Sequence, residues 1–395
     1  MRTFKLTSES VTEGHPDKLC DQISDRILDA YLTKDPHALV AMECMISHNL
    51  LVIAGEVKST ASIAVEKIAR DVLVEVGYTS SGTGIDGANC FIIKNIHEQS
   101  ANIRQGVLKG SDKEKIGAGD QGMMYGFACV ETEELMPLSI ALAHQLAKRL
   151  ADVRKDQTLP FLLPDGKAQV TLEYDEHFQP IRIDEVVISA QHKSEVNIDL
   201  LRDAIMKHVI DPVLSGQPRD GQTRIIINHI GQFVLGGPFA DTGLTGRKII
   251  VDTYGGVIPH GGGAFSGKDG TKVDRSGAYM ARYVAKNIVA AGLATRCQVA
   301  LSYVIGGSHP SSIAIETFGT ATIDPAQMHD IVATVFDFSP KAIIDALVLH
   351  QPIFSKTSVY GHFKEDSALP WEQVDKVALL KKIVQKLHTL GGDAY

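Results

Sequence analysis

The feature that most constrains the fold is an order of elements that recurs along the chain. Apolar spacing predicts a strand, a helix, two strands, a helix and a strand in residues 3–94, and the same order in residues 125–228. A third, less regular round follows in residues 248–336. A recurring unit of this kind indicates similar domains, each with a sheet covered by helices. We therefore predict an α/β (α+β type) protein of three similar β-α-β-β-α-β domains.

The predicted N-terminal, central and C-terminal domains span residues 1–113, 114–235 and 236–395. In the first domain, Pro16 suits the first position of a helix. A second helix is predicted over 60–76, capped by Ser59 or Thr60. Gly77 is placed to end that helix, because glycine readily adopts the left-handed conformation found there.

The third round gives a weaker pattern than the first two. A strand is predicted at 248–254 and a long helix at 274–291, and two strands and a helix that ends near Phe336 follow. The chain beyond Phe336 has no clear periodicity, so we expect it to be irregular.

Composition narrows the class of protein. The 395 residues are enough for several domains, and 44% hydrophobic with 22% charged residues is typical of a globular protein. A net charge of −8 argues against partners such as nucleic acid or a membrane surface. No signal peptide and no apolar run of membrane-spanning length is found, so we expect a cytoplasmic protein. Five cysteines without a C-x-x-C pair are expected to be buried thiols in a reducing compartment: Cys20, Cys44, Cys90, Cys129 and Cys297.

A glycine-rich loop, Gly261–Ser276, comes directly before the long predicted helix of the third round. Glycines allow backbone N–H groups to face a ligand, and the start of a helix attracts anions. Lysines at that end oppose the helix dipole, so a bound polyphosphate would explain them better than stability does. Asp269 stands where a Walker A loop needs serine or threonine, so the loop is not of that type. A solvated glycine loop is the alternative.

Comparison of the three rounds locates the expected chemistry. The first helix of round one starts with His15, Asp17 and Lys18, and that of round three starts within Lys268–Asp274. In round two the same place holds Met136–Leu138, which offers no charged group. Since a scaffold alone would not need this difference, we expect the two charged helix starts to form two sides of one site.

Several acidic and basic residues are candidates for that site. Glu43 lies within an apolar predicted strand, where a carboxylate is costly unless it forms a buried salt bridge or binds a cation. Asp17 and Asp274 at helix starts either complement the dipole or bind Mg²⁺, which prefers oxygen ligands. Four cations on an acidic chain fit a triphosphate: Arg247, Lys248, Lys268 and Lys272.

Residues 95–122 form a long polar connection that is rich in glycine and glutamine. Connections of this length inside a compact chain are functional lids or disordered inserts. Glycines near its end could act as hinges, which favours a lid.

The motifs resemble those of S-adenosylmethionine synthetases (methionine adenosyltransferases) over nearly the whole chain. Four segments, in the family's order, carry the resemblance: Thr7–Lys18, Gly117–Gly122, Gly243–Lys248 and Gly261–Ser276. The resemblance implies three domains related by pseudo-threefold symmetry. It also implies a transferase that makes S-adenosylmethionine from ATP and L-methionine and hydrolyses the triphosphate to phosphate and pyrophosphate. Two Mg²⁺ per site and K⁺ are the implied cofactors, and the active site is expected between two subunits of a homodimer, with a homotetramer as the assembly.

The same resemblance implies roles for individual residues. Asp17 and Asp274 match Mg²⁺ ligands, and Glu43 matches the K⁺ ligand. His15, Arg247, Lys268 and Lys272 match catalytic residues. The implied ATP contacts are His15, Asp165, Lys167, Gln232, Phe233, Asp241, Arg247, Lys248, Ala264 and Lys268. The implied methionine contacts are Glu56, Gln99, Asp241, Lys272 and Ile305.

Some positions depart from the family pattern. Gln232 replaces a usual arginine beside the expected adenine site, and Gly270 replaces a common proline, which predicts a more mobile loop. Gly306–Pro310 and Lys364–Glu365 also differ from the usual sequence. Two other functions stay open at this point: an ATP-dependent kinase or ligase, which would need an acceptor and a base, and a nucleotide-binding regulatory protein without turnover.

Overall fold

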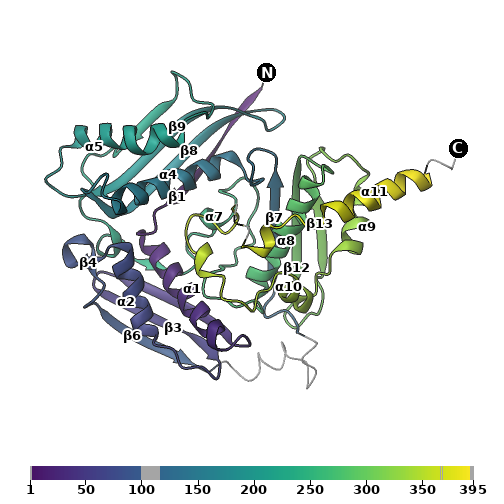
Figure 1. Ribbon diagram of the computed structural model, residues 1–395, viewed down its shortest axis with the longest axis horizontal. Coiled ribbons are helices and arrows are strands. Elements are labelled where there is room, and N and C mark those ends of the chain that lie inside the picture. The colour runs from purple at the N-terminus through teal and green to yellow at the C-terminus, as the bar shows by residue number, and fades with distance from the viewer. Residues whose placement is uncertain (1, 99–115, 365, 367, 392–395) are drawn as a thin grey trace.

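The computed structural model describes residues 2–98, 116–364, 366 and 368–391. Three groups of strands and helices lie around a common centre (Figure 1). The mixed α/β class predicted from the sequence is confirmed. Gln99 and the region of the expected lid around residues 99–111 lie outside the described residues.

The first sheet contains mainly N-terminal strands. Across the sheet the order is β11 (Gly243–Leu244), β2 (Leu39–Ser47), β3 (Leu50–Lys58) and β6 (Phe91–His97). Its helices are α1 (Pro16–Lys34) and α2 (Val65–Val76), and a short hairpin follows, β4 (Thr79–Ser80) with β5 (Ile85–Asp86). β3 and β6 are parallel and the other pairs are antiparallel, so the sheet is mixed.

The second sheet is built around the central part of the chain. Its order is β1 (Thr3–Val11), β8 (Leu162–Asp175), β9 (Pro180–His192) and β10 (Arg224–Ile227). The helices that accompany it are α4 (Leu138–Lys155), α5 (Ile198–Ile205) and α6 (Asp211–Val213), with one π-helical stretch over Met206–Ile210. These elements have a core of their own, separate from the apolar core that joins the other two sheets.

The third sheet contains C-terminal strands, in the order β13 (Ser312–Glu316), β12 (Arg296–Tyr303) and β7 (Gly122–Cys129). Its helices are α8 (Val273–Ala290), α9 (Pro325–Val335), α10 (Pro340–Ala346) and α11 (Val377–Gly391). α8 is buried along most of its length and packs on β7 and β12.

The first strand of each predicted domain belongs to another domain's sheet. β1 pairs with β8, β7 pairs with β12, and β11 pairs with β2. Each sheet therefore ends with a strand from a distant part of the chain, and this exchange ties the three groups together. The predicted boundaries at residues 113 and 235 stay predictions.

Three predictions about individual elements are wrong. The strand expected at 248–254 is a short helix, α7 (Ile249–Asp252), because a short apolar run does not separate a strand from a buried helix. The second helix starts at Val65 rather than near residue 60. Ser59 and Thr60 do not cap it; their hydroxyls donate to the Asp35 carboxylate instead. The chain beyond Phe336 is not wholly irregular, since it contains α10 and α11.

Among the described residues, no helix combines the length and apolar character needed to cross a membrane. All five cysteines are free and buried, as predicted. Burial raises the pKa of the Cys90 thiol, which argues against a reactive thiolate there.

Candidate active site

The start of α1 is built around a buried histidine. His15 occupies the N-cap position, and its Nδ1 accepts a hydrogen bond from the Asp17 backbone N–H at 3.2 Å. Burial, and then the nearby Lys248 ammonium, lower the pKa of His15 to about 3. The ring is therefore neutral near pH 7. Because Nδ1 is an acceptor, Nε2 carries the proton and can donate it in a hydrogen bond.

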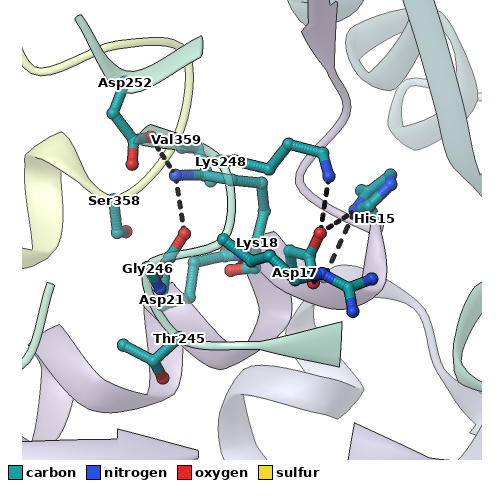
Figure 2. A network of polar contacts seen from close by, with 12 residues as sticks. His15, Asp17, Lys18, Asp21, Thr245, Gly246, Lys248, Asp252, Ser358 and Val359 are labelled. Carbon is teal, nitrogen blue, oxygen red and sulfur yellow. Dashed lines mark hydrogen bonds and ion pairs between the residues drawn. The ribbon is translucent and has the colours of Figure 1, made fainter. Parts of the chain in front are cut away.

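Asp17 is the centre of a network that spans more than half of the chain (Figure 2). One carboxylate oxygen accepts from the Leu244 N–H at 3.0 Å and lies 3.1 Å from Nε of Arg247. The other lies 2.6 Å from Nζ of Lys248. Burial alone would raise the pKa of Asp17, but these donors outweigh it and lower the pKa. Asp17 thus holds two of the predicted triphosphate cations beside His15.

A row of buried aspartates on α1 holds several distant segments. Asp17, Asp21, Asp25 and Asp29 follow at intervals of four residues, so they share one face of the helix. They accept backbone N–H groups at 2.8–3.0 Å from Leu244, Gly246, Gly267, Phe354 and Ser355. Only Asp17 of this row was among the predicted site residues. The signal was available, since like charges four residues apart destabilise an exposed helix and so indicate partners.

A second buried cation joins α1 to α7. Lys18 is 1% exposed, and its Nζ lies 3.0 Å from Asp21 and 2.5 Å from Asp252 (Figure 2). Burial would lower the pKa of Lys18, but the two carboxylates outweigh it and raise the pKa. Burial raises the pKa of Asp252 to about 7, although Lys18 opposes this. Neither Asp21 nor Asp252 was a predicted site residue.

The start of α8 carries two ion pairs between residues that lie close in the sequence. Lys268 lies 2.5 Å from Asp274, and Lys272 lies 2.5 Å from Asp269. Asp269 also accepts the Val40 N–H at 2.6 Å, which fixes the loop on β2. A cavity of about 10 Å³ beside Asp274 has room for little more than one water.

The two charged helix starts belong to loops that touch. Gly246, in the loop held by α1, approaches Ala264 so closely that a Cβ at residue 246 would lie 2.2 Å from the Ala264 Cβ. Gly246 has φ +74°, which only glycine adopts easily. Within the described parts of the chain, however, no hydrogen bond or ion pair joins His15, Asp17 or Lys248 to the Lys268–Asp274 segment. The connection between the two sides is made further along α1, where Asp25 accepts the Gly267 N–H at 2.8 Å and pairs with Arg275 of α8.

The other predicted ATP contacts lie around the second sheet. Asp165 is buried, accepts the Gly237 N–H at 2.9 Å, and has a second carboxylate oxygen without a partner among the described residues. Burial raises its pKa to about 6. Lys167 is exposed on β8, close enough for its charge to contribute to the low pKa of His15. Phe233 is half-buried and shares two hydrogen bonds with His192, whereas Gln232 is exposed.

The predicted methionine and K⁺ residues are more exposed. Glu43 was expected inside an apolar strand, but its side chain is exposed because β2 alternates and Glu43 lies on the outward face. Glu56 lies 3.6 Å from His97, and Asp241 lies 3.7 Å from Arg247. Ile305 is 57% exposed.

Two departures from the family pattern have a structural setting. Gly270 is buried, and a Cβ there would lie 2.8 Å from the Cβ of Leu349, so packing accounts for the glycine. Lys364 is largely buried, and its Nζ donates to the carbonyls of Lys356 and Val359. Burial lowers the pKa of Lys364 to about 8.

We next consider whether the acidic and histidine side chains of the site could bind a metal ion. In the described part of the chain, no three His, Cys, Asp or Glu side chains gather closely enough to hold one. Asp17 and Asp274 each offer one hard carboxylate. That fits Mg²⁺, which commonly uses one or two carboxylates together with substrate phosphates and water.

Family models and related proteins match nearly the whole chain. Family models described as the N-terminal, central and C-terminal domains of S-adenosylmethionine synthetase match residues 3–101, 115–233 and 235–373. The S-adenosylmethionine synthase of Petrotoga mobilis is 54% identical over 396 residues, which cover 96% of this chain and 99% of the relative. That of Pseudothermotoga lettingae is 53% identical over 388 residues, which cover 95% and 98%. The predicted enzyme class is confirmed: the chain belongs to the S-adenosylmethionine synthetase family and makes S-adenosylmethionine.

Proposed function

We propose that the two charged helix starts carry out this synthesis on ATP and L-methionine and then hydrolyse the released triphosphate to phosphate and pyrophosphate. The observation that carries the proposal is the buried Asp17 network, which holds Arg247 and Lys248 next to a neutral His15. Fixed cations and a hydrogen-bond donor at one place suit a reaction in which a polyphosphate leaves carbon.

The first step needs alignment rather than a base. The methionine sulfur attacks C5′ of ATP with its lone pair, the C5′–O bond breaks, and triphosphate leaves with the bonding electrons. The Nε2–H of His15 donates a hydrogen bond to the departing oxygen, which its neutral state allows. The second step is attack of water on the triphosphate, with Arg247, Lys268 and Lys272 stabilising the transferring phosphoryl group.

We assign the cofactors by the residues that could hold them. Asp17 and Asp274 would contact two Mg²⁺, and Glu43 would contact K⁺. The metal ions supply charge neutralisation on the phosphates when they are bound. In this chain the carboxylates of Asp17 and Asp274 are paired with lysines, so binding of Mg²⁺ and triphosphate would exchange one set of ion pairs for another.

The other ATP and methionine contacts are those that the family resemblance implies. For ATP we propose Asp165, Lys167, Gln232, Phe233, Asp241, Lys248 and Ala264 in addition to the catalytic groups. For methionine we propose Glu56, Gln99, Asp241, Lys272 and Ile305. The unpartnered oxygen of buried Asp165 supports its role, because such an atom is costly without a partner.

We propose a homodimer with shared active sites, paired into a homotetramer. Several observations support this. Among the described residues no hydrogen bond or ion pair joins His15, Asp17 or Lys248 to the Lys268–Asp274 segment, and the cavity beside Asp274 is too small to admit a nucleotide. Phe91 and Ile93 on the edge strand β6 are 72% and 54% exposed, which a partner would cover. Exchange of the opening strands among the three sheets supports pseudo-threefold symmetry, and five free thiols support a cytoplasmic location.

A product assay tests the proposal. Purified protein is given ATP, methionine, Mg²⁺ and K⁺, and S-adenosylmethionine, phosphate and pyrophosphate are measured together. Equal amounts of all three, dependent on methionine, are expected. ATP breakdown that ignores methionine, or S-adenosylmethionine formed without equal phosphate and pyrophosphate, would contradict the proposed coupling of the two steps.

A further inference from the structure

The segment that carries Arg247 and Lys248 is attached to β2, through β11 and Thr245, and to α1. It runs from β11 through Gly246 to α7, and it is exposed at Leu244, Arg247 and Ile250. Besides the Asp17 ion pairs, three of its contacts with α1 are the Leu244 N–H at Asp17, the Gly246 N–H at Asp21, and the Asp252 carboxylate at Lys18. The position of the two cations therefore depends on the polar face of α1.

Lys18 holds two of these three points at once. Its Nζ lies between Asp21, which binds the middle of the segment, and Asp252, which ends it (Figure 2). Asp252 is also fixed from behind, because its carbonyl accepts the His362 N–H at 2.9 Å. With Lys18 removed, two buried carboxylates would face each other without a cation, and the segment between them would have to move.

On the basis of the function proposed above, we infer that Lys18 is a positioning residue of the active site, which acts on the triphosphate through the segment Gly243–Asp252. It need not touch substrate, since its ammonium is buried and paired with two carboxylates. A displacement of about 1 Å in a binding group can lower a rate on the order of a hundredfold. A residue whose role is only to hold the fold together would not change substrate binding selectively.

The test is the variant Lys18→Met, which keeps an unbranched side chain one atom shorter and removes its charge. The Michaelis constant for ATP is expected to rise roughly tenfold or more, and that for methionine to change by less than about twofold. Hydrolysis of inorganic tripolyphosphate, used as a probe without adenosine, is expected to show the same rise in Michaelis constant. Thermal unfolding confirms that the assay temperature lies below the transition.

The matched control is Lys286→Met. Lys286 is also a buried lysine beside a carboxylate, 2.6 Å from Glu372, but it lies on α8 outside the proposed site. We expect Lys286→Met to lower thermal stability and to leave both Michaelis constants unchanged. Should Lys18→Met lower only stability, as Lys286→Met does, the inference is overturned.

Two further variants keep the inference testable. If Lys18→Met does not fold, the variant Asp252→Leu tests the inference instead. It keeps the Lys18–Asp21 ion pair and removes only the contact between Lys18 and α7. The same selective rise for ATP and tripolyphosphate supports the inference, and unchanged constants overturn it. Lys248→Met separates failure of the inference from failure of the proposed function, because an unchanged Michaelis constant for ATP there would contradict the function itself.

Discussion

The starts of α1 and α8 carry the same kinds of side chain but hold them differently. At α1, Asp17 is fully buried and contacts Leu244, Arg247 and Lys248, more than 200 positions away in the sequence. At α8, Lys268 pairs with a carboxylate six residues away and stays 24% exposed. The Asp17 contacts join distant parts of the chain, whereas the Lys268–Asp274 pair joins residues that are close in the sequence. The α1 side is therefore held by more partners before substrate binds, and the partly exposed Lys268–Asp274 pair is the easier of the two to exchange for substrate.

The substitution that best separates the two sides is Asp17→Asn against Asp274→Asn. Removing one partner of a buried ion pair leaves an unpaired charge, so Asp17→Asn is expected to lower the free energy of unfolding by roughly 3 kcal/mol. Asp274→Asn breaks a partly exposed pair and should cost about 1 kcal/mol or less. Urea unfolding of both variants measures this difference. Equal losses would show that the two sides are equally structural and would break the comparison.

His15 allows a sharper test of the α1 side. Loss of a donor to the leaving oxygen should lower the turnover number of His15→Ala on the order of a hundredfold or more. The exposed His177, in the turn between β8 and β9, provides the control variant His177→Ala, for which wild-type turnover is expected. Single-turnover formation of S-adenosylmethionine is the measurement. An unchanged rate in His15→Ala would remove the proposed role of this residue.

The helix starts also show what the sequence could predict. Pro16 and the charged residues after it indicated both the start of α1 and a site, because local chemistry determines both. The Asp17–Asp29 row was visible only as an unexplained spacing, since its partners are brought there by tertiary structure. Glu43 was misplaced because an apolar run does not tell which face of a strand is covered. The strand predicted at 248–254 failed for a similar reason: α1 holds that segment through the Asp17–Lys248 and Lys18–Asp252 ion pairs, which no local pattern encodes.

The first helix of the central domain, α4, has no charged group at its start, but it contributes a histidine, His144, to the contact with β1. His144 is buried, and its Nδ1 lies 2.8 Å from the Ser10 hydroxyl. Burial, and then Lys364 and Lys18, lower its pKa to about 3. Between pH 6.5 and 3 the unfolded chain therefore binds a proton at His144 that the folded chain does not. The free energy of unfolding consequently falls as the pH drops below about 6.5.

From this we expect a pH-dependent difference between wild type and His144→Gln. Acidification from pH 7 to pH 5 should lower the wild-type free energy of unfolding by roughly 2 kcal/mol more than that of the variant. Urea unfolding at the two pH values tests this. Parallel pH dependence in the two proteins would show that His144 is protonated in the folded state as well.

The smallest effect is expected at Gly270, in the loop before α8. The glycine stands where relatives commonly have proline, and the sequence alone suggested a more mobile loop. Its buried position indicates a packing reason instead, because a Cβ would lie 2.8 Å from the Cβ of Leu349 and 3.4 Å from Cγ1 of Ile344. Gly270→Ala should therefore destabilise the protein by about 1 kcal/mol through overpacking.

The matched variant is Gly221→Ala, since a Cβ at Gly221 meets no atom within 4 Å. It should change the melting temperature little, or raise it slightly, because alanine restricts the unfolded chain. If Gly270→Ala instead proved as stable as wild type, Leu349 would have yielded, and the loop of Lys268 and Lys272 would be more adaptable than its burial indicates. That outcome would extend the contrast with α1, because the α8 side would then be adjustable in its backbone as well as in its ion pairs.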